Sequence, residues 1–381
     1  MASTSRRKLD SGKYKYGFQG PDRKWHYKTH GRKESAERWL RDQLTALDRG
    51  EWIDPRIRRT TVAEFAERWF ESTAHLKPKT REGYESLLRV YVVPEFGSWR
   101  VSDVNRASVR TWLSRLQSSG LSPSRTRQAR SALSSILEHA VDAGALRANP
   151  ARGVKVSGNS DREMLFLDAG QVSRLVDEAE RVEKDSGALV LLLAFSGLRW
   201  GEAAALRRGR CDLLRSQIHI REAVSEVKGQ MHFGETKTGK NRTIVVPGFL
   251  RDRLAAHMVT NPADGAEAFV FADSKGGPLR NSNWRHRVWK PACEASGMPD
   301  GLRIHDLRHT AASLAVSAGA NVKAVQRMLG HSTATQTLDR YAHLFTEDLE
   351  ALADRLDKAF SQQNASYARP LPSDEVVELV G

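Results

Sequence analysis

Residues 188–205 read ALVLLLAFSGLRWGEAAA and decide the character of the C-terminal half of the chain. The first eight residues are all apolar, which is typical of a helix buried on every side, and Ser196-Gly197 interrupts the run. Eight apolar residues are far too few to cross a bilayer, so no membrane association is expected. Arg199 and Glu202 follow the break. An Arg after a buried helix is most often part of an ion pair, so this segment alone says little about function.

A mixed, mostly helical domain is predicted around this segment, over residues 163–360. Asp168-x-x-Gln171 has the pattern of a capping box and starts a helix. Residues 217–246 have the pattern of strands, with turns at Lys228-Gly229 and Thr238-Gly239. Helical patterns dominate the remainder of the domain.

The whole chain has 381 residues, a length that suits two or three domains. Thr61-x-x-Glu64 is a second capping box and opens a compact helical unit, in which the second helical pattern ends before Pro94. Short alternating stretches near the N-terminus predict a small sheet, followed by a helix at about 35–47. The expected fold class is therefore multidomain and mainly α with small β elements. Its predicted divisions are 1–55, 60–150, 163–360 and a flexible tail at 361–381.

The charge balance favours a polyanionic partner. Sixty Lys and Arg against 46 Asp and Glu give a net charge of +14, which points first to nucleic acid. A ribosome-associated or membrane-surface protein would fit the charge alone equally well. Residues 1–60 hold sixteen Lys or Arg and eight Asp or Glu, so we predict a separate basic module at the N-terminus.

Basic and aromatic residues interleave on the predicted N-terminal strands. Such a surface can enter a DNA groove and neutralise phosphates, although a solvated sheet face has the same composition. In the helical unit, Lys79 and Arg125 suit contacts with backbone phosphates but are also ordinary on a solvated helical face. The N-terminal candidates for DNA binding are Lys13, Lys15, Arg23, Lys24, Trp25 and Lys28, with Arg32, Tyr14, Tyr16 and Tyr27 on the same predicted surface.

The two cysteines, Cys211 and Cys293, are far apart and have no His or Cys neighbours at metal-ligand spacing. Neither a disulfide framework nor a zinc site is predicted. The N-terminus lacks the apolar stretch of a secretion signal. A reducing cytoplasm is therefore the expected location, with no metal or cofactor.

Five short motifs stand out in the predicted C-terminal domain. Taken singly, each is weak evidence for catalysis, because an isolated Arg, Lys or His is usually structural or solvated. Their joint order is more informative. The motifs are SGLRWGE with Arg199 and Glu202, TKTGKNR with Lys237, HDLRHT with His305 and Arg308, LGHS with His331, and DRYAH with Tyr341.

Together these residues can supply every role needed to break a phosphodiester without a metal. Tyr341 is the candidate nucleophile, and its pKa near 10 in water means that it needs a proton acceptor or nearby positive charge. His305 is the candidate base, because it lies three residues before Arg308 on one face of a predicted helix. Arg199 and Arg308 can bind the phosphate oxygens bidentately and offset the charge that develops there.

The remaining roles are less sharply defined by the sequence. Lys237, beside a predicted turn, can deliver a proton to the 5′-leaving oxygen, and Lys240 is a competing candidate for that role. His331 follows Gly330 at a predicted helix end, where it can donate a hydrogen bond to a phosphate oxygen. Glu202, three residues after Arg199, is expected to brace that arginine.

The ordered set Arg199, Lys237, His305-x-x-Arg308, His331 and Tyr341 is similar to the catalytic set of the tyrosine recombinases, the phage integrase family. All six family positions are filled. The resemblance implies that 163–360 is the catalytic domain, that 60–150 is a helical core-binding (SAM-like) domain, and that 1–55 is an arm-type DNA-binding domain.

The same resemblance implies a function. Double-stranded DNA would be cut at core and arm attachment sites through a 3′-phosphotyrosyl intermediate, and religation would need neither ATP nor metal. A homotetramer would exchange strands through a four-way junction, integrating and excising a phage or another mobile element. A C-terminal segment would pass to the adjacent protomer. An excisionase and a host DNA-bending protein are further suggested partners.

Two other functions remain open on the sequence. A type IB topoisomerase-like enzyme has related chemistry but relaxes supercoils, and a basic N-terminal module for site recognition is of little use to it. A non-catalytic DNA-binding protein of the same fold would be credible if any of the six positions were lost.

Overall fold

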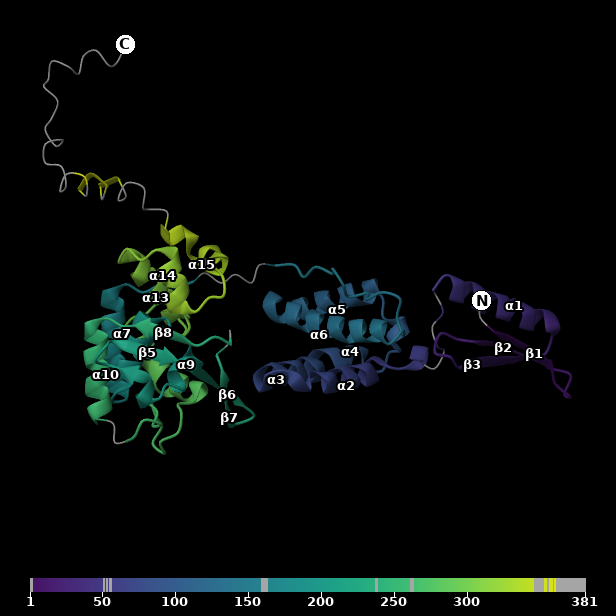
Figure 1. Ribbon diagram of the computed structural model, residues 1–381, viewed down its shortest axis with the longest axis horizontal. Coiled ribbons are helices and arrows are strands. Elements are labelled where there is room, and N and C mark those ends of the chain that lie inside the picture. Colours follow the sequence, from purple (N-terminus) through teal and green to yellow (C-terminus); the bar gives the residue numbers. More distant parts are fainter. Residues whose placement is uncertain are drawn as a thin grey trace, which may run out of the picture. The chain divides into compact units, whose positions relative to one another are not determined.

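The computed structural model describes residues 3–50, 52, 54, 57–158, 164–236, 239–260, 264–345, 353–354, 356–358 and 360. Lys237, Thr238 and the predicted tail at 361–381 lie outside the described residues. The chain forms two compact units, Met1–Asp161 and Arg162–Gly381 (Figure 1). Within the described residues, none of the helices combines the length and the apolar composition needed to cross a membrane.

The first unit begins with a three-stranded antiparallel sheet in the order β1-β2-β3, formed by β1 (Thr4–Lys8), β2 (Tyr14–Gln19) and β3 (Trp25–His30). Helix α1 (Lys33–Asp48) runs along one face of this sheet (Figure 1). Tyr16 and Phe18 of β2 are buried together with Ala36 and Leu40 of α1, which gives this part a small core of its own.

The rest of the first unit is helical. Phe65, Trp112 and Leu133 are buried in its core, and the predicted capping box is present, since the Glu64 amide donates to Thr61 Oγ1 and the Thr61 amide donates to Glu64 Oε2. Its α-helices are α2 (Val62–Ser72), α3 (Pro78–Leu87), α4 (Val93–Phe96), α5 (Arg106–Ser118) and α6 (Pro123–Asp142). Short 3₁₀ turns cover Ile57–Arg59, Thr73–His75 and Val101–Asp103.

The prediction that the second helical pattern ends before Pro94 is wrong. A π turn, Leu88–Val92, continues α3 directly into α4, and Pro94 lies in the first turn of α4. Proline lacks an N–H and normally breaks the i→i−4 ladder. The π turn just before Pro94 replaces the i→i−4 hydrogen bonds by i→i−5 bonds, and this change in the ladder lets the helix continue past the proline.

The second unit contains both helices and strands. Its strands form a three-stranded sheet in the order β4-β5-β8 and a two-stranded sheet β6-β7. The α-helices are α7 (Ala169–Val182), α8 (Ser186–Ser196), α9 (Trp200–Ala204), α10 (Gly248–Thr260), α11 (Asn281–Trp284), α12 (Lys290–Ala295), α13 (Asp306–Ser317), α14 (Val322–Leu329) and α15 (Ala334–Tyr341). The strands are β4 (Cys211–Asp212), β5 (Gln217–Ile220), β6 (Glu222–Val227), β7 (Gln230–Glu235) and β8 (Arg242–Val245). Shorter 3₁₀ and π turns cover Arg208–Arg210, Arg285–Trp289 and Ala342–Phe345.

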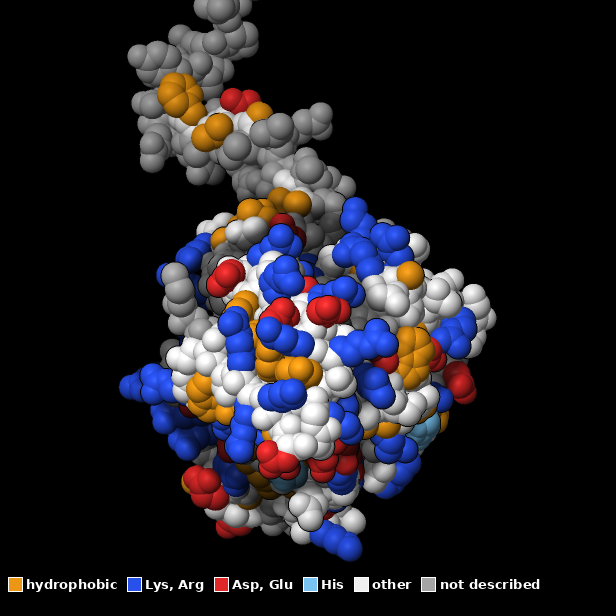
Figure 2. Space-filling model, turned by 90° about the vertical axis from the view of Figure 1, so that its right-hand side faces the viewer, with side chains coloured by type: hydrophobic (Ala, Val, Ile, Leu, Met, Phe, Trp, Pro, Cys, Tyr) orange, Lys and Arg blue, Asp and Glu red, His pale blue; other side chains and the backbone are white. Residues whose placement is uncertain are grey.

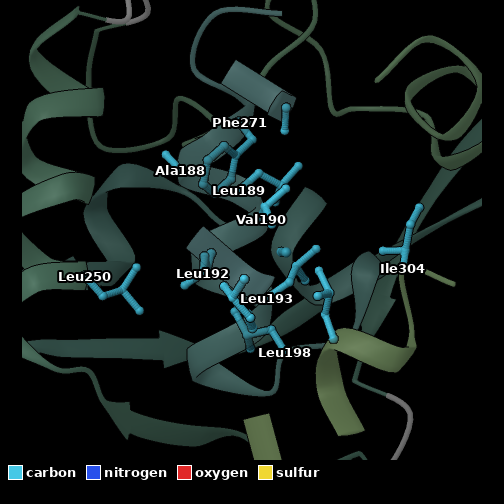
Figure 3. Close-up of a cluster of buried hydrophobic side chains, with 14 of the residues drawn as sticks. Ala188, Leu189, Val190, Leu192, Leu193, Leu198, Leu250, Phe271 and Ile304 are labelled. Atoms are coloured by element: carbon cyan, nitrogen blue, oxygen red, sulfur yellow. The ribbon is translucent and has the colours of Figure 1, made fainter. Parts of the chain in front are cut away.

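Helix α8 lies in the centre of this second unit, as its apolar sequence predicts. Figure 3 shows its side chains Leu189, Val190, Leu192 and Leu193 within the buried cluster. The helix ends at Gly197, which has a φ of +65°. A Cβ at Gly197 would lie 2.6 Å from Leu329 Cδ2, so only glycine lets the end of α8 approach the end of α14 this closely. The predicted break therefore brings two distant segments together.

Two other local predictions for this unit are confirmed. Asp168 and Gln171 form the capping box at the start of α7, with hydrogen bonds of 2.7 and 2.9 Å. The turn at Lys228-Gly229 joins β6 to β7, and both of its residues have positive φ, as a tight hairpin requires. The multidomain, mainly α fold with small sheets agrees with the expected class.

Candidate active site

Glu202 is the buried anion around which the site is built. Its side chain is only 1% exposed and it lies in α9, just after the Gly197 break. Arg199, the residue that precedes α9, donates to the carboxylate from its backbone N–H (3.0 Å) and from Nη1 (2.9 Å). Burial alone would raise the pKa of Glu202, but hydrogen bonds from Arg242 and then from Arg199 outweigh it and lower the pKa to about 2. The bracing role predicted for Glu202 agrees with this geometry.

Arg308 is deeply buried, at 2% exposure. It lies in the first turn of α13, where Nη1 donates to the Gly197 carbonyl and Nη2 donates to the Leu329 carbonyl at 2.6 Å. Burial, and then the charge of Arg199, lower the pKa of its guanidinium to about 9. Arg308 therefore ties the ends of α8 and α14 together and remains charged at neutral pH.

Tyr341, at the end of α15, has no exposed surface. It packs against Ala312, Val325 and Leu329, and its ring stacks on the ring of His331 with centroids 6.5 Å apart. Its hydroxyl is hydrogen bonded to Nδ1 of His309 at 2.8 Å. Burial raises the pKa of Tyr341 and outweighs the opposing charges of Arg308 and Arg340, so the phenol is protonated in this conformation.

His309, rather than His305, contacts the candidate nucleophile, which the sequence reasoning missed. His309 follows Arg308 directly and lies four residues after His305, a spacing that places both imidazoles on one face of a helix. That spacing was the available signal. Burial first, and neighbouring arginines after it, lower the pKa of His309 to about 4. A neutral imidazole can accept the proton of the tyrosine hydroxyl through Nδ1.

His305 lies immediately before α13, and its side chain is exposed. Its ring centroid is 5.3 Å from that of His309. Desolvation, followed by the charges of His309 and Arg308, lowers its pKa to about 4. His305 is therefore a neutral, accessible imidazole at the edge of the site.

His331 lies between α14 and α15, after the left-handed residue Gly330 (φ +66°). Nδ1 of its ring is 2.9 Å from the Thr337 hydroxyl, a contact that fixes the orientation of the imidazole. Burial, followed by the charges of Arg308 and Arg340, lowers its pKa to about 4. Since Arg199 also contributes to this shift, the structure brings four of the five predicted motifs into one electrostatic neighbourhood.

Of the two lysine candidates for the general acid, only Lys240 lies among the described residues. Lys237 lies outside the described residues. Lys240 is exposed, and its backbone carbonyl accepts a hydrogen bond from the Thr236 hydroxyl at 3.0 Å. Both lysines belong to the connection between β7 and β8, which leads directly into Arg242.

Two family models match the sequence. Residues 165–348 match the phage integrase family, and residues 62–156 match the phage integrase central domain. A protein of Mycobacterium tuberculosis named as a prophage phiRv2 integrase is 30% identical over 347 residues, which cover 88% of this chain and 90% of the relative. The chain belongs to the phage integrase family. It is a site-specific tyrosine recombinase, an enzyme that cleaves and rejoins DNA.

Solved structures of integrases share the fold. One is the Tn1549 transposon integrase in complex with transposon right-end DNA, with a TM-score of 0.70 and 22% identity over 78% of this chain and 100% of that chain. Another is a lambda integrase tetramer bound to a Holliday junction, with a TM-score of 0.58 and 18% identity over 87% of this chain and 94% of that chain. The topoisomerase-like and non-catalytic alternatives are not favoured by these findings.

The N-terminal sheet of this integrase-family chain divides the predicted DNA-binding residues between two faces. Successive side chains alternate along a strand, and the register pairs Lys15 with Thr29 and Tyr16 with Lys28. Tyr14, Tyr16 and Lys28 therefore share the face that packs on α1. The expectation that they form one surface with Lys15 and Trp25 is wrong. The sequence predicted the strands but not their pairing register, and without the register the face on which each side chain lies is not determined.

The outer face of the sheet carries an exposed aromatic pair. Trp25 and Tyr27 stack with ring centroids 5.7 Å apart, and Lys15 Nζ lies 4.7 Å above the Tyr27 ring. Lys13, Arg23 and Lys24 are exposed in the connections beside this face. Figure 2 shows Lys and Arg side chains over much of the face that it draws, with hydrophobic side chains exposed between them.

The two candidates in the helical unit already have partners within the chain. Lys79 pairs with Glu82 at 2.7 Å, and Arg125 donates to the hydroxyl of Ser86 at 3.2 Å. Arg125 also lies over the ring of Tyr91, 5.6 Å from its centroid. DNA contact at either residue would have to compete with these interactions.

The low pKa of Glu202 predicts a specific acid sensitivity. Its folded-state pKa of about 2 is below the ordinary value of 4.5, so its stabilising contribution is complete above pH 4.5 and is lost as the pH falls towards 2. The difference corresponds to about 3 kcal/mol. Urea unfolding of the wild type and of Glu202→Gln between pH 5 and pH 2 measures this contribution. The free energy of unfolding should fall further in the wild type than in Glu202→Gln, by about this amount. Equal losses in both proteins would contradict the assignment.

Proposed function

We propose that Tyr341 attacks the scissile phosphate and forms a 3′-phosphotyrosyl intermediate with a free 5′-hydroxyl. The observation that carries this proposal is the position of the Tyr341 hydroxyl, which lies 2.8 Å from a neutral imidazole and within the field of Arg308. The new P–O bond replaces the bond to the 5′-oxygen. The phosphodiester energy is therefore retained, and attack by the 5′-hydroxyl on the phosphotyrosine reverses the step.

Arg199 and Arg308 stabilise the charge that develops on the phosphorane. Both are held by the chain itself, Arg199 through Glu202 and Arg308 through two carbonyls, so their positions are set before DNA binds. His331, with its ring fixed by Thr337, donates a hydrogen bond to a phosphate oxygen. A lysine of the β7–β8 connection, Lys237 or Lys240, protonates the 5′-leaving oxygen.

The tyrosine proton passes to an imidazole of α13. His309 holds the hydroxyl in the conformation described, and His305 is the accessible imidazole next to it. Because Tyr341 has no exposed surface, α15 must move for the hydroxyl to reach a phosphate. His305, the base expected from the sequence, is the more exposed of these two histidines, so we assign the base role to it.

The assembly that exchanges strands is a homotetramer on DNA, an arrangement present in the lambda integrase complex with a Holliday junction. We propose core and arm attachment sites as the DNA partners. An excisionase and a host DNA-bending protein would set the direction, and the reaction would integrate and excise a phage or another mobile element in the bacterial cytoplasm.

The decisive experiment is the capture of the covalent intermediate. A nicked duplex from the DNA that flanks the coding gene is incubated with the protein, and the adduct is digested to locate the modified residue. The expected result is a phosphotyrosyl peptide that contains Tyr341. Two such duplexes should also give recombinant joints, whereas relaxation without joints would favour a topoisomerase. No adduct on any flanking site would exclude the proposed chemistry.

The outer face of the N-terminal sheet supplies an arm-DNA surface through Trp25, Tyr27 and Lys15. Lys15→Ala is expected to lower the salt dependence of DNA binding by about one phosphate contact, because each neutralised phosphate releases counterions. Lys28→Ala is a matched control, since Lys28 is the same residue type on the opposite face. Fluorescence anisotropy at several salt concentrations measures both slopes. Equal changes in the two variants would contradict the assignment of faces.

A further inference from the structure

Arg242 is a buried arginine that the catalytic set does not include. It lies at the start of β8, two residues after Lys240, and its side chain is 10% exposed. Nη2 and Nη1 donate to the two carboxylate oxygens of Glu202 at 2.6 and 3.1 Å. Arg242 therefore forms a bidentate pair with the same carboxylate that braces Arg199.

The third nitrogen of this guanidinium reaches another part of the site. Nε of Arg242 donates to the Met328 carbonyl at 3.3 Å, near the end of α14. Gly330 packs directly on the side chain, since a Cβ at this position would lie 2.9 Å from Arg242 Cδ. The residue that follows Gly330 is His331. Arg242 thus contacts Glu202, which holds Arg199, and the turn at Gly330, which carries His331.

The hydrogen bonds of Arg242 and Arg199 show which of the two arginines has donors left for a phosphate. Those of Arg242 use three of its five N–H groups, and the fork formed by Nη1 and Nη2 is already occupied by the Glu202 carboxylate rather than by a phosphate. Arg199 gives Glu202 only its backbone N–H and Nη1, and its Nε and Nη2 have no hydrogen-bond partner among the described residues. Without Arg242, the uncompensated carboxylate would draw in the whole Arg199 guanidinium and occupy the donors that a phosphate needs.

We propose that Arg242 is a positioning residue of the recombinase, which neutralises Glu202 so that Arg199 keeps its Nε and Nη2 nitrogens free for the scissile phosphate. It also fixes the turn that carries His331. This inference rests on the proposed function, because it assigns a task to Arg199 in that reaction. A lysine could not replace Arg242, since a point charge lacks the planar fork that binds both carboxylate oxygens.

The test compares two substrates. Arg242→Gln is expected to slow formation of the Tyr341 adduct by roughly 100-fold on a normal phosphodiester, the typical effect of losing one transition-state donor, with little change in DNA affinity. On a duplex whose scissile phosphate carries a methyl group in place of one non-bridging oxygen, the group is neutral and needs less cationic stabilisation. The defect of Arg242→Gln should therefore shrink to less than about tenfold, as that of Arg199→Lys should.

The matched control is Arg280→Gln, which removes the Arg280–Glu226 ion pair of the same unit and none of the hydrogen bonds described for the site. It should behave as the wild type on both substrates. An equal loss for Arg242→Gln on both substrates would show a purely structural role and overturn the proposal, as would full activity on the phosphodiester. Arg242→Lys should be as slow as Arg242→Gln. Wild-type activity in Arg242→Lys would contradict the requirement for a guanidinium that binds both carboxylate oxygens of Glu202.

A second measurement separates this inference from the proposed function. If the wild type forms no adduct on either substrate, the proposed chemistry fails, and the positioning of Arg199 is then measured directly. In the full chain labelled with ¹⁵N-arginine, the Nε–Hε resonance of Arg199, identified by its absence in Arg199→Lys, should shift in Arg242→Gln and stay in place in Arg280→Gln. An unshifted resonance in Arg242→Gln would overturn the positioning role whatever the activity.

Discussion

Tyr341→Phe is expected to abolish the covalent protein–DNA adduct while the protein stays folded and binds DNA. The ring of Phe can fill the same buried space and stack on His331, so packing is retained. The loss of the hydroxyl leaves Nδ1 of His309 without its hydrogen bond, at a cost of about 1–3 kcal/mol. Since no other group takes over a missing nucleophile, the adduct should fall below detection rather than to a fraction of the wild-type amount.

The measurement is adduct formation on a nicked duplex, with thermal unfolding and DNA affinity recorded for the same preparations. Tyr91→Phe is a suitable control, because Tyr91 is a half-buried tyrosine of the helical unit whose ring carries a cation–π contact that Phe can also make. Tyr91→Phe should form the adduct at the wild-type rate. An adduct with Tyr341→Phe would place the nucleophile at another residue.

Arg308→Lys is expected to have the second largest effect, a loss of roughly 1000-fold or more in the rate of adduct formation. The Arg308 guanidinium donates to the carbonyls of Gly197 and Leu329 and still presents a fixed charge to the site. A lysine ammonium is a single point on a flexible stem and cannot hold two carbonyls and a phosphate in one geometry. Leaving a buried carbonyl without its donor also lowers the free energy of unfolding by about 1–3 kcal/mol.

Single-turnover cleavage and urea unfolding separate these two effects. Activity is measured well below the unfolding temperature of the variant, so that the folded protein is compared with the folded wild type. Arg287→Lys changes an exposed arginine that pairs with Glu183, and it should leave both quantities nearly unchanged. If Arg308→Lys cleaves within tenfold of the wild type, Arg308 does not stabilise the transition state.

Local signals in the sequence predicted much of the fold. The two capping boxes and the break after the buried helix each depend on residues within a few positions of one another, and all three are present. Two predictions were wrong: that a helix ends before Pro94, and that Lys28 lies on the same face of the sheet as Lys15. They depend on a π turn and on strand register, which no local pattern determines.

The candidate site shows the same division between local and long-range information. The motifs named Arg199, Glu202, Arg308 and Tyr341 because their residue types suit phosphoryl chemistry. Arg242 and His309 lie inside or beside those motifs and were still missed. Their partners are 40 and 32 residues away in the chain, so nothing near Arg242 distinguishes it from a solvated arginine, and His309 has only its four-residue spacing from His305 as a local signal.

The burial of Tyr341 has a consequence for the cell that carries this enzyme. A hydroxyl with no exposed surface cannot reach the phosphate of DNA that binds transiently, so a protomer in this conformation cannot cleave DNA. Breaking the chromosome becomes conditional on whatever binding energy draws α15 out of its packing against α13 and α14. The burial that keeps the phenol protonated therefore also protects DNA from cleavage outside an assembled complex.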